Sequence, residues 1–209
     1  MEFEMDDRLK EMISAPLLET AALLAALSDQ GGGSIFRAAC LIAGSMRSGG
    51  KLMLCGNGGS AADCQHMAAE FVCRLSSQRE RPALPAIALT TDSSFLTAFC
   101  NDYCFEDVFT RQVQALGRPG DVLMGISTSG SSQNVIRALN EAAVLKIGTV
   151  ALTRKGGSIS RIADVSLEVG SDNTAVIQNV HIAIEHVLCA LVEEMIFGVE
   201  QHIGKGDAV

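Results

Sequence analysis

Tryptophan is absent from this chain of 209 residues, and only one tyrosine and eight phenylalanines are present. A composition poor in aromatics and rich in small aliphatic residues favours helices packed on a parallel sheet over an all-β sandwich. Sixteen basic against twenty-four acidic side chains give a net charge of −8. This scarcity of positive charge argues against a nucleic-acid-binding surface, which neutralises phosphates with Lys and Arg. Any bound phosphate should instead be held by backbone N–H groups and hydroxyls.

The seven cysteines form no C-x-x-C pair and are odd in number, which argues against a disulfide framework. Most of them lie in apolar stretches, so we expect buried, reduced thiols in a cytoplasmic protein. The acidic start of the chain lacks the basic residues and apolar run of a signal peptide. We also expect no run of about 18 uncharged apolar residues, the length of a membrane span. The chain is therefore expected to bind neither membranes nor nucleic acid.

Short apolar segments alternate with segments of helical periodicity along most of the chain. Two helices are expected first, one with Leu9 to Leu24 on a single face and one from Ile35 to Met46 with Ser34 as its N-cap; Gly31 to Gly33 separate them. Strands are then expected at Lys51–Cys55, Ala86–Thr90, Val122–Ser127, Thr149–Thr153 and Val165–Val169, and helices at about Ser60–Leu75, Cys104–Leu116, Ser132–Leu145 and Thr174–Phe197. This order predicts an α/β fold with a parallel sheet covered on both faces.

The chain is expected to be one compact domain, residues 49–209, preceded by a helical extension, residues 1–48. The extension is apolar on one face and could pack on a partner subunit. Ligands of open parallel sheets bind beyond the carboxyl ends of the strands. The loops after Cys55, Thr90 and Ser127 are therefore the candidate binding loops.

A glycine-rich turn follows the first strand, in the segment CGNGGSAAD that begins at Cys55. Glycines permit close approach of the backbone, and the N-terminus of the next helix offers unpaired N–H groups to an anion. Gly56, Gly58 and Ala61 also fit the loose G-x-G-x-x-A dinucleotide pattern. The acidic partner of that pattern and the lysine of a P-loop are both missing, so nucleotide binding is disfavoured.

A cluster of hydroxyls follows the third strand, where Ser127, Thr128, Ser129, Ser131 and Ser132 surround a single glycine. Ser132 alone could be an ordinary helix N-cap. Capping does not require the other hydroxyls, and small hydroxyls with helix-end N–H groups can replace the hydration shell of a phosphate. The sequence therefore predicts a phosphate-binding loop here.

Two helices carry polar groups within apolar surroundings. His66 and Glu70 are spaced i,i+4 and so share a face of one helix; Gln178 and His186 share a side of the last helix, with His181 on the other flank. A structural His–Glu pair, or a pair of Glu70 with nearby Arg74, would explain the first helix by itself. Two helices that each bring a histidine and a second ligand-type group favour a site, and the four groups could hold a metal such as Zn²⁺.

Several ordered motifs resemble the phosphoheptose isomerases, which have the sugar isomerase (SIS) fold. They are GNGGSAADCQHMAAE, ALTTD, FCNDY, GDVLMGISTSGSS and IQNVHIAIEH, and the resemblance extends from about Gly49 to Gly198. It implies a five-stranded parallel sheet and a homotetramer with active sites between subunits. It also implies conversion of sedoheptulose 7-phosphate into D-glycero-D-manno-heptose 7-phosphate, the first step toward activated heptose for surface lipopolysaccharide.

The resemblance also implies roles for individual residues. Glu70 and His186 would be the proton-transfer pair, and one Zn²⁺ per subunit would be held by His66, Glu70, Gln178 and His186. Substrate contacts are implied for Asn57, Gly58, Gly59, Glu70, Asn101, Asp102, Ser127, Thr128, Ser129, Ser132 and Gln178. The chain departs from many relatives at Val176, Asn179 and Ser131, where they have Arg, Glu and Asn.

Two alternatives remain open at the level of sequence. Relatives with the same fold act as non-catalytic regulators that bind a replication initiator protein, but they lack the equivalents of Glu70 and His186. The second alternative is an isomerase of a different sugar phosphate, because the motifs specify the phosphate and the enediol chemistry better than the length of the sugar.

Overall fold

A parallel sheet of five strands forms the centre of the computed structural model, which describes residues 5–29 and 32–198. The strand order is β2-β1-β3-β4-β5, and every neighbouring pair is parallel. The strands are β1 (Leu52–Gly56), β2 (Ala86–Ala88), β3 (Val122–Ser127), β4 (Gly148–Arg154) and β5 (Val165–Val169). All five expected strands are confirmed. Gly31, which belongs to the predicted break between the first two helices, lies outside the described residues. Residues 199–209, at the end of the predicted domain, lie outside them too.

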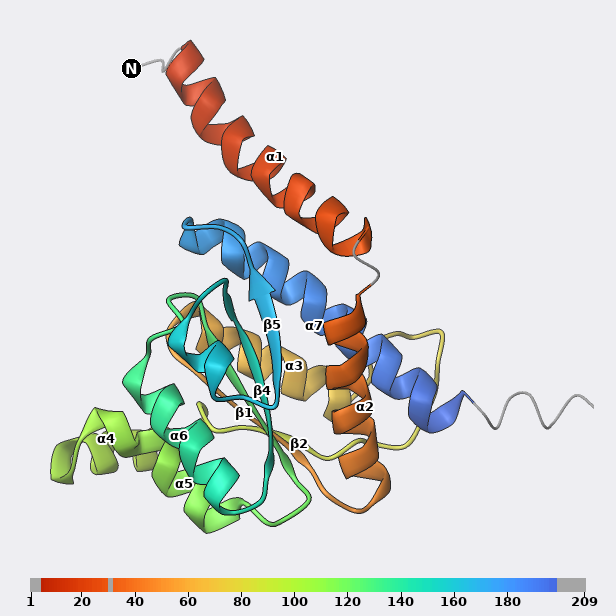
Figure 1. Ribbon diagram of the computed structural model, residues 1–209, viewed down its shortest axis with the longest axis vertical. Coiled ribbons are helices and arrows are strands. Elements are labelled where there is room, and N and C mark those ends of the chain that lie inside the picture. Colours follow the sequence, from red (N-terminus) through yellow and green to blue (C-terminus); the bar gives the residue numbers. More distant parts are fainter. Residues whose placement is uncertain (1–4, 30–31, 199–209) are drawn as a thin grey trace, which may run out of the picture.

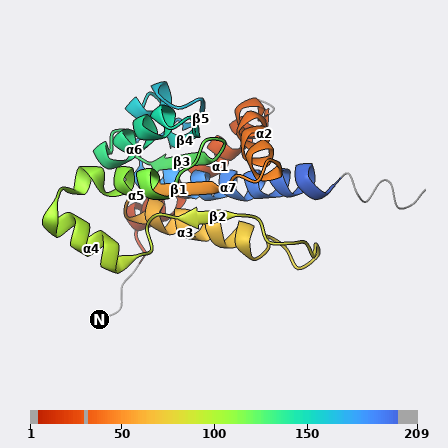
Figure 2. The ribbon, with the colours of Figure 1, turned by 90° about the horizontal axis from the view of Figure 1, so that it is seen from below.

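Helices cover both faces of this sheet (Figures 1 and 2). They are α1 (Asp7–Asp29), α2 (Gly33–Arg47), α3 (Gly59–Val72), α4 (Ser93–Asp102), α5 (Val108–Leu116), α6 (Gln133–Val144) and α7 (Thr174–Phe197). On one face, α2, α3 and α7 pack on one set of strand side chains, including Leu54 and Met124. On the other, α5 and α6 pack on the alternate set, including Met53 and Leu123. The central strands β1, β3 and β4 are buried on both faces, which explains their apolar composition.

Two local predictions are corrected by the structure. Ser34 is not the N-cap of the second helix, because α2 begins at Gly33 and its N-cap position is Gly32 with a φ of 60°. Helix α4 was not expected at all. Its N-cap is Asp92, whose carboxylate accepts the backbone N–H of Phe95 at 3.0 Å. The combination of an acidic N-cap and aromatic residues four apart is the sequence signal that could have revealed α4.

The cysteines only partly follow the expectation of buried thiols. All seven are free, which confirms that the chain has no disulfide framework. Cys55, Cys64 and Cys189 are buried, and burial raises the pKa of Cys55 to about 12. Cys40, Cys73, Cys100 and Cys104 are exposed or only partly buried, so for these four the prediction is wrong. An apolar neighbourhood in sequence does not decide which face of a helix a residue occupies.

The two longest helices differ in how far they are buried. Helix α7 lies against α2 and α3 in the core, whereas α1 contacts α7 and contains no buried residue. Figure 1 shows α1 extending away from the sheet. Both reach a membrane span in length and hydropathy, with mean hydropathy of 1.3 for α1 and 1.6 for α7. Neither helix contains a run of 18 uncharged residues, because Glu19 interrupts α1 and Glu185 interrupts α7, and half of the α7 segment is buried inside this domain.

Candidate active site

The reversal of strand order in the sheet places the two predicted binding loops side by side. Strand β1 pairs with β2 on one side and with β3 on the other, so connections from β1 and β3 leave the sheet at a topological switch point. Gly56 at the end of β1 pairs with Ile126, the residue before Ser127. The glycine turn and the hydroxyl cluster therefore lie at the same edge, each directly before a helix N-terminus.

The hydroxyl loop is folded around Ser127, whose side chain is buried beneath it. Ser127 Oγ lies 2.9 Å from Ser132 Oγ and 3.3 Å from Ser129 Oγ, and it accepts the backbone N–H of Gly130 at 3.1 Å. Ser132 is at the N-cap position of α6, but its hydroxyl makes no capping hydrogen bond. The structure thus gathers three of the predicted hydroxyls at one helix N-terminus that no serine side chain caps, an arrangement that suits an anion.

The loop after β4 packs against the hydroxyl loop at Gly130. Gly130 has a φ of 68°, and a Cβ at this position would lie 2.5 Å from Gly157 Cα and 2.8 Å from Thr153 Oγ1. The carbonyl of Gly130 also accepts the backbone N–H of Ile159 at 3.1 Å. Both the positive φ and the close approach require glycine here. The segment after β4 therefore restricts the position of the hydroxyl loop relative to the sheet.

The two binding loops are joined by a pair of amide side chains. Asn57 Nδ2 donates to Asn134 Oδ1 at 2.9 Å, and Asn134 Nδ2 donates back to Asn57 Oδ1 at 2.8 Å. Asn134 is 2% exposed and lies in the first turn of α6. Sequence reasoning named Asn57 and missed Asn134; the signal was an amide within the apolar face of a predicted helix. The pair holds the glycine turn and the hydroxyl loop at a fixed separation.

Helices α3 and α7 bring the two predicted histidines into direct contact. His66 Nε2 lies 2.8 Å from His186 Nε2, and the ring planes are nearly perpendicular at 81°. Glu70 lies one turn further along α3, with its Oε1 3.9 Å from His66 Nε2. Gln178 lies against the start of α3, because a Cβ on Gly59 would overlap its side-chain amide. All four predicted metal ligands, which include the predicted acid–base pair, thus lie along one α3–α7 interface.

Of the two simpler explanations for Glu70, the pair with His66 is present at 3.9 Å and the pair with Arg74 is not. Arg74 pairs with Glu80 at 2.8 Å instead of with Glu70. Glu70 Oε2 is buried and has no hydrogen-bond partner among the described residues. A buried carboxylate oxygen without a partner is costly and is typical of a site that awaits a ligand, a metal or a proton.

Further polar groups without partners lie along α3 and α7. They include Asp63 Oδ2, both carboxylate oxygens of Glu185 and both ring nitrogens of His181, counted over the described residues. Burial raises the pKa of Glu185 to about 9, with a smaller contribution from the charge of Asp63. Burial lowers the pKa of His181 to about 4, so this ring is neutral in the core. Strongly shifted pKa values at one interface are typical of functional sites.

The donor set at this interface fits zinc in its chemistry, with two imidazoles, one carboxylate and one amide. Only the two imidazole nitrogens approach each other closely. Within residues 5–29 and 32–198, no group of three His, Cys, Asp or Glu side chains is arranged to hold a metal ion. The single chain therefore offers the ligands without assembling three of them around one point.

Two predicted substrate residues lie apart from the rest in the single chain. Asn101 and Asp102 are the last residues of α4, which packs on α5, and the amide of Asn101 donates to Asp102 at 2.9 Å. Both are exposed. Of the positions that depart from many relatives, Val176 is buried in the core and Asn179 is exposed.

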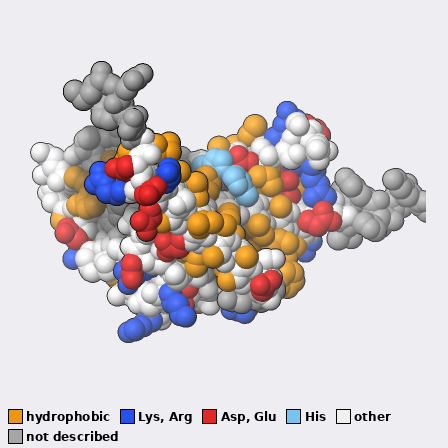
Figure 3. Space-filling view, turned by 90° about the horizontal axis from the view of Figure 1, so that it is seen from above, with side chains coloured by type: hydrophobic (Ala, Val, Ile, Leu, Met, Phe, Trp, Pro, Cys, Tyr) orange, Lys and Arg blue, Asp and Glu red, His pale blue; other side chains and the backbone are white. Residues whose placement is uncertain are grey.

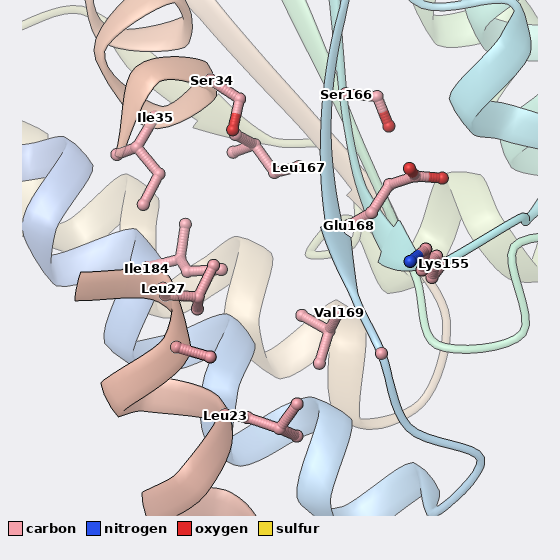
Figure 4. Close-up of a pocket in the computed structure, with 12 residues that line it drawn as sticks. Leu23, Leu27, Ser34, Ile35, Lys155, Ser166, Leu167, Glu168, Val169 and Ile184 are labelled. Carbon is pink, nitrogen blue, oxygen red and sulfur yellow. The ribbon is translucent and has the colours of Figure 1, made fainter. Parts of the chain in front are cut away.

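The surface beside the histidines is largely apolar. Figure 3 shows hydrophobic side chains beside the histidines on this face, and Val187 next to His186 is 47% exposed. A cavity of about 340 Å³ lies elsewhere, between α1 and the edge strand β5 (Figure 4). Its lining includes Leu23, Leu27, Lys155, Ser166 and Glu168, none of which is a predicted site residue.

Comparison with known proteins assigns the fold and the family. The model of the SIS domain family matches residues 17–154, which is more than half of the chain. A phosphoheptose isomerase of Nitratidesulfovibrio vulgaris is 47% identical over 194 residues, covering 92% of each chain. One of Roseiflexus sp. is 59% identical over 152 residues, covering 72% of this chain and 76% of that protein. The chain belongs to the phosphoheptose isomerase family.

The solved structures of phosphoheptose isomerases share the whole fold described above. The structure from Neisseria gonorrhoeae superimposes with a TM-score of 0.81 at 43% identity, covering 89% of this chain and 99% of that chain. This agreement confirms the predicted SIS fold with its five-stranded sheet. The match to the SIS domain begins at residue 17 and therefore includes residues 17–29 of the exposed α1.

The Asn57–Asn134 pair leads to a first prediction. Asn134→Leu is expected to raise the KM for a phosphorylated substrate by about 5- to 50-fold, with a smaller change in kcat. The half-buried amide of Asn57 loses both partners, which costs at most about 1–3 kcal/mol and releases the glycine turn. Steady-state kinetics will measure this. Asn140→Leu, an exposed position on α6, is the matched control. An unchanged KM in the Asn134 variant would show that the pair does not set the spacing of the loops.

Proposed function

We propose that this chain is an aldose–ketose isomerase that converts sedoheptulose 7-phosphate into D-glycero-D-manno-heptose 7-phosphate. Relatives up to 59% identical carry the name phosphoheptose isomerase. The observation that carries the proposal is the contact of His66 and His186 next to Glu70, on helices that begin at the binding edge of the sheet. The non-catalytic regulator is disfavoured because the chain has both Glu70 and His186.

The proposed reaction moves a proton between C1 and C2 of the sugar through an enediol. The hydroxyl loop at Ser127 binds the terminal phosphate and holds the substrate by this remote group. Glu70 removes a proton from C1 of the ketose while His186 donates a proton to O2, which gives the enediol. Glu70 then returns the proton to C2, and His186 takes the proton from O1, which completes the aldose. No proton is gained or lost overall.

The contact between the two imidazoles supports the role of His186. At 2.8 Å, one Nε2 must donate a hydrogen bond and the other must accept it, so the two rings hold opposite tautomers or share a proton. The contact places His66 directly beside His186, where it can hold that ring in a fixed orientation.

We propose in addition that His66, Glu70, Gln178 and His186 hold one Zn²⁺ per subunit. A bound zinc ion would polarise a substrate oxygen as a Lewis acid. The pairing of two imidazole nitrogens and the unpartnered oxygen of Glu70 support the ligand set. We expect the purified protein to contain zinc by mass spectrometry and its Tm to fall when zinc is removed by a chelator. His66→Ala should lose the metal, and a wild-type protein free of zinc after growth with zinc would contradict the proposal.

We also propose that the protein is a cytoplasmic homotetramer with active sites between subunits. The support is the large apolar surface of α1, where Met12, Leu17 and Leu18 are each more than 60% exposed. Apolar surface of this extent on a helix is typical of a protein–protein interface. Light scattering coupled to gel filtration measures the oligomeric state, and a stable monomer would contradict it. In an assembly, the exposed Asn101 and Asp102 would be free to complete a neighbouring site.

The decisive experiment is incubation of the pure protein with sedoheptulose 7-phosphate and detection of the aldose phosphate. The same assay with unphosphorylated sedoheptulose tests the role of the phosphate loop, and assays with fructose 6-phosphate and an amino-sugar phosphate test the alternative of another substrate. Turnover of the heptulose phosphate alone is the expected result. Absence of turnover with all phosphorylated sugars, with zinc supplied, would favour the regulator.

A further inference from the structure

A buried arginine caps the C-terminal end of α3, the helix that carries Glu70. The side chain of Arg81 is 1% exposed, in the segment that follows α3. Its guanidinium donates to the carbonyls of Glu70 and Phe71, each at 2.7 Å, and to that of Pro82 at 3.1 Å. The last carbonyls of a helix have no partner within the helix, and a positive charge at this end is favourable. Arg81 therefore orders the final turn of α3.

The same guanidinium is held by an acidic residue of α7. Arg81 Nε donates to Glu193 Oε1 at 2.7 Å, and Nη2 approaches the same oxygen at 2.6 Å. The side chain of Glu193 is only 5% exposed. Glu193 lies seven residues after His186, which places the two residues nearly on the same face of α7, two turns apart. One ion pair thus connects the helix that presents Glu70 to the helix that presents His186.

This connection matters because Glu70 lies only two residues before the end of α3. Helix ends fray, and a carboxylate in a loosened last turn has no fixed position. In acid–base catalysis, a displacement of about 1 Å can lower the rate by about 10²-fold. Helix α7 is buried in the core and has a fixed position. A bond from α7 to the last turn of α3 therefore holds that turn in place.

We propose that Arg81 and Glu193 form a positioning pair that sets the Glu70 carboxylate relative to His186. The proposal rests on the proposed function, in which these two groups share the proton transfer. Neither Arg81 nor Glu193 touches the substrate in this role. Both act through the backbone of α3, by holding the carbonyl of Glu70 itself.

The test uses Arg81→Lys and the double variant Arg81→Met/Glu193→Gln in the full-length protein. Lysine keeps the charge, but a single ammonium group lacks the planar fork that reaches several carbonyls and the carboxylate together. The double variant leaves no buried charge without a partner, so it remains informative if the single variant fails to fold. The matched control is Arg79→Lys/Glu194→Gln, which alters the neighbouring ion pair at 2.8 Å with side chains 21% and 61% exposed.

We expect kcat with sedoheptulose 7-phosphate to fall by about 10- to 100-fold in both Arg81 variants. KM should stay within threefold, and the control should stay within twofold in both constants. A merely structural role would lower the Tm but leave kcat per folded molecule unchanged, and that result would overturn the proposal.

Hydrogen exchange at the end of α3 provides a readout that does not depend on catalysis. The N–H of Cys73, which bonds to the Ala69 carbonyl at 2.8 Å, should exchange at least tenfold faster in the Arg81 variants. Unchanged exchange would overturn the proposal whatever the substrate proves to be. If the wild-type protein shows no isomerase activity, the proposed function fails, and exchange alone then decides whether the pair orders this turn.

Discussion

Glu70→Gln is expected to lower kcat for sedoheptulose 7-phosphate by about 10²–10⁴-fold, the usual contribution of a positioned acid–base group. Glutamine has nearly the same shape as glutamate but cannot remove a proton from carbon. The substrate is held mainly through its phosphate, at the loop around Ser127, so KM should remain within about threefold. Steady-state kinetics of the pure variant will separate the two constants.

Exchange of the transferred proton with solvent tests the role of Glu70 as the base. In D₂O, the wild-type enzyme should incorporate deuterium at carbon during turnover, which NMR detects, and Glu70→Gln should not. Glu80→Gln is the control, because the side chain of Glu80 is 86% exposed and pairs with Arg74. Near-normal turnover in the Glu70 variant would remove this residue from the proton transfer.

Gly130→Ala is expected to abolish most phosphate binding and to raise KM by at least tenfold. Alanine at a φ of 68° costs about 1–2 kcal/mol in backbone strain. Its Cβ would also lie 2.5 Å from Gly157 Cα, which is backbone and cannot rotate away. Overpacking of this kind costs about 1–3 kcal/mol. The hydroxyl loop must shift to relieve the backbone strain and the steric overlap. The hydroxyls of Ser127 and Ser132, which lie 2.9 Å apart, then move away from the positions that bind phosphate.

The control for this variant is Gly170→Ala, where φ is not positive and no atom lies within 4 Å of an added Cβ. Kinetics with sedoheptulose 7-phosphate and competition by inorganic phosphate measure the effect. We expect weaker phosphate inhibition in Gly130→Ala and no change in Gly170→Ala. Equal affinity in the two variants would mean that the phosphate lies somewhere other than this loop.

Local patterns in the sequence were sufficient for most of the elements and for the two loops. The strands were predictable because each is a short apolar run followed by glycine or hydroxyl residues, and α7 because its apolar periodicity continues for 24 residues. Helix α4 was missed because its apolar face is short and mostly exposed, so its only signals are the N-cap at Asp92 and the aromatic residues four apart. The exposure of α1 and of four cysteines could not be predicted from composition, because it depends on which helix faces pack against the rest of the fold.

The sequence by itself determined the parallel α/β fold and the hydroxyl loop around Ser127, because each depends on residue type and short-range spacing. The candidate roles of Glu70 and His186 came from the resemblance of its motifs to a known family. Only the tertiary structure decided that His66 and His186 touch, that Asn134 joins the two loops, and that Arg81 and Glu193 connect α3 to α7. These pairs are separated by 120, 77 and 112 residues. Contacts of this kind arise from the packing of whole helices on the sheet, and no local pattern encodes them.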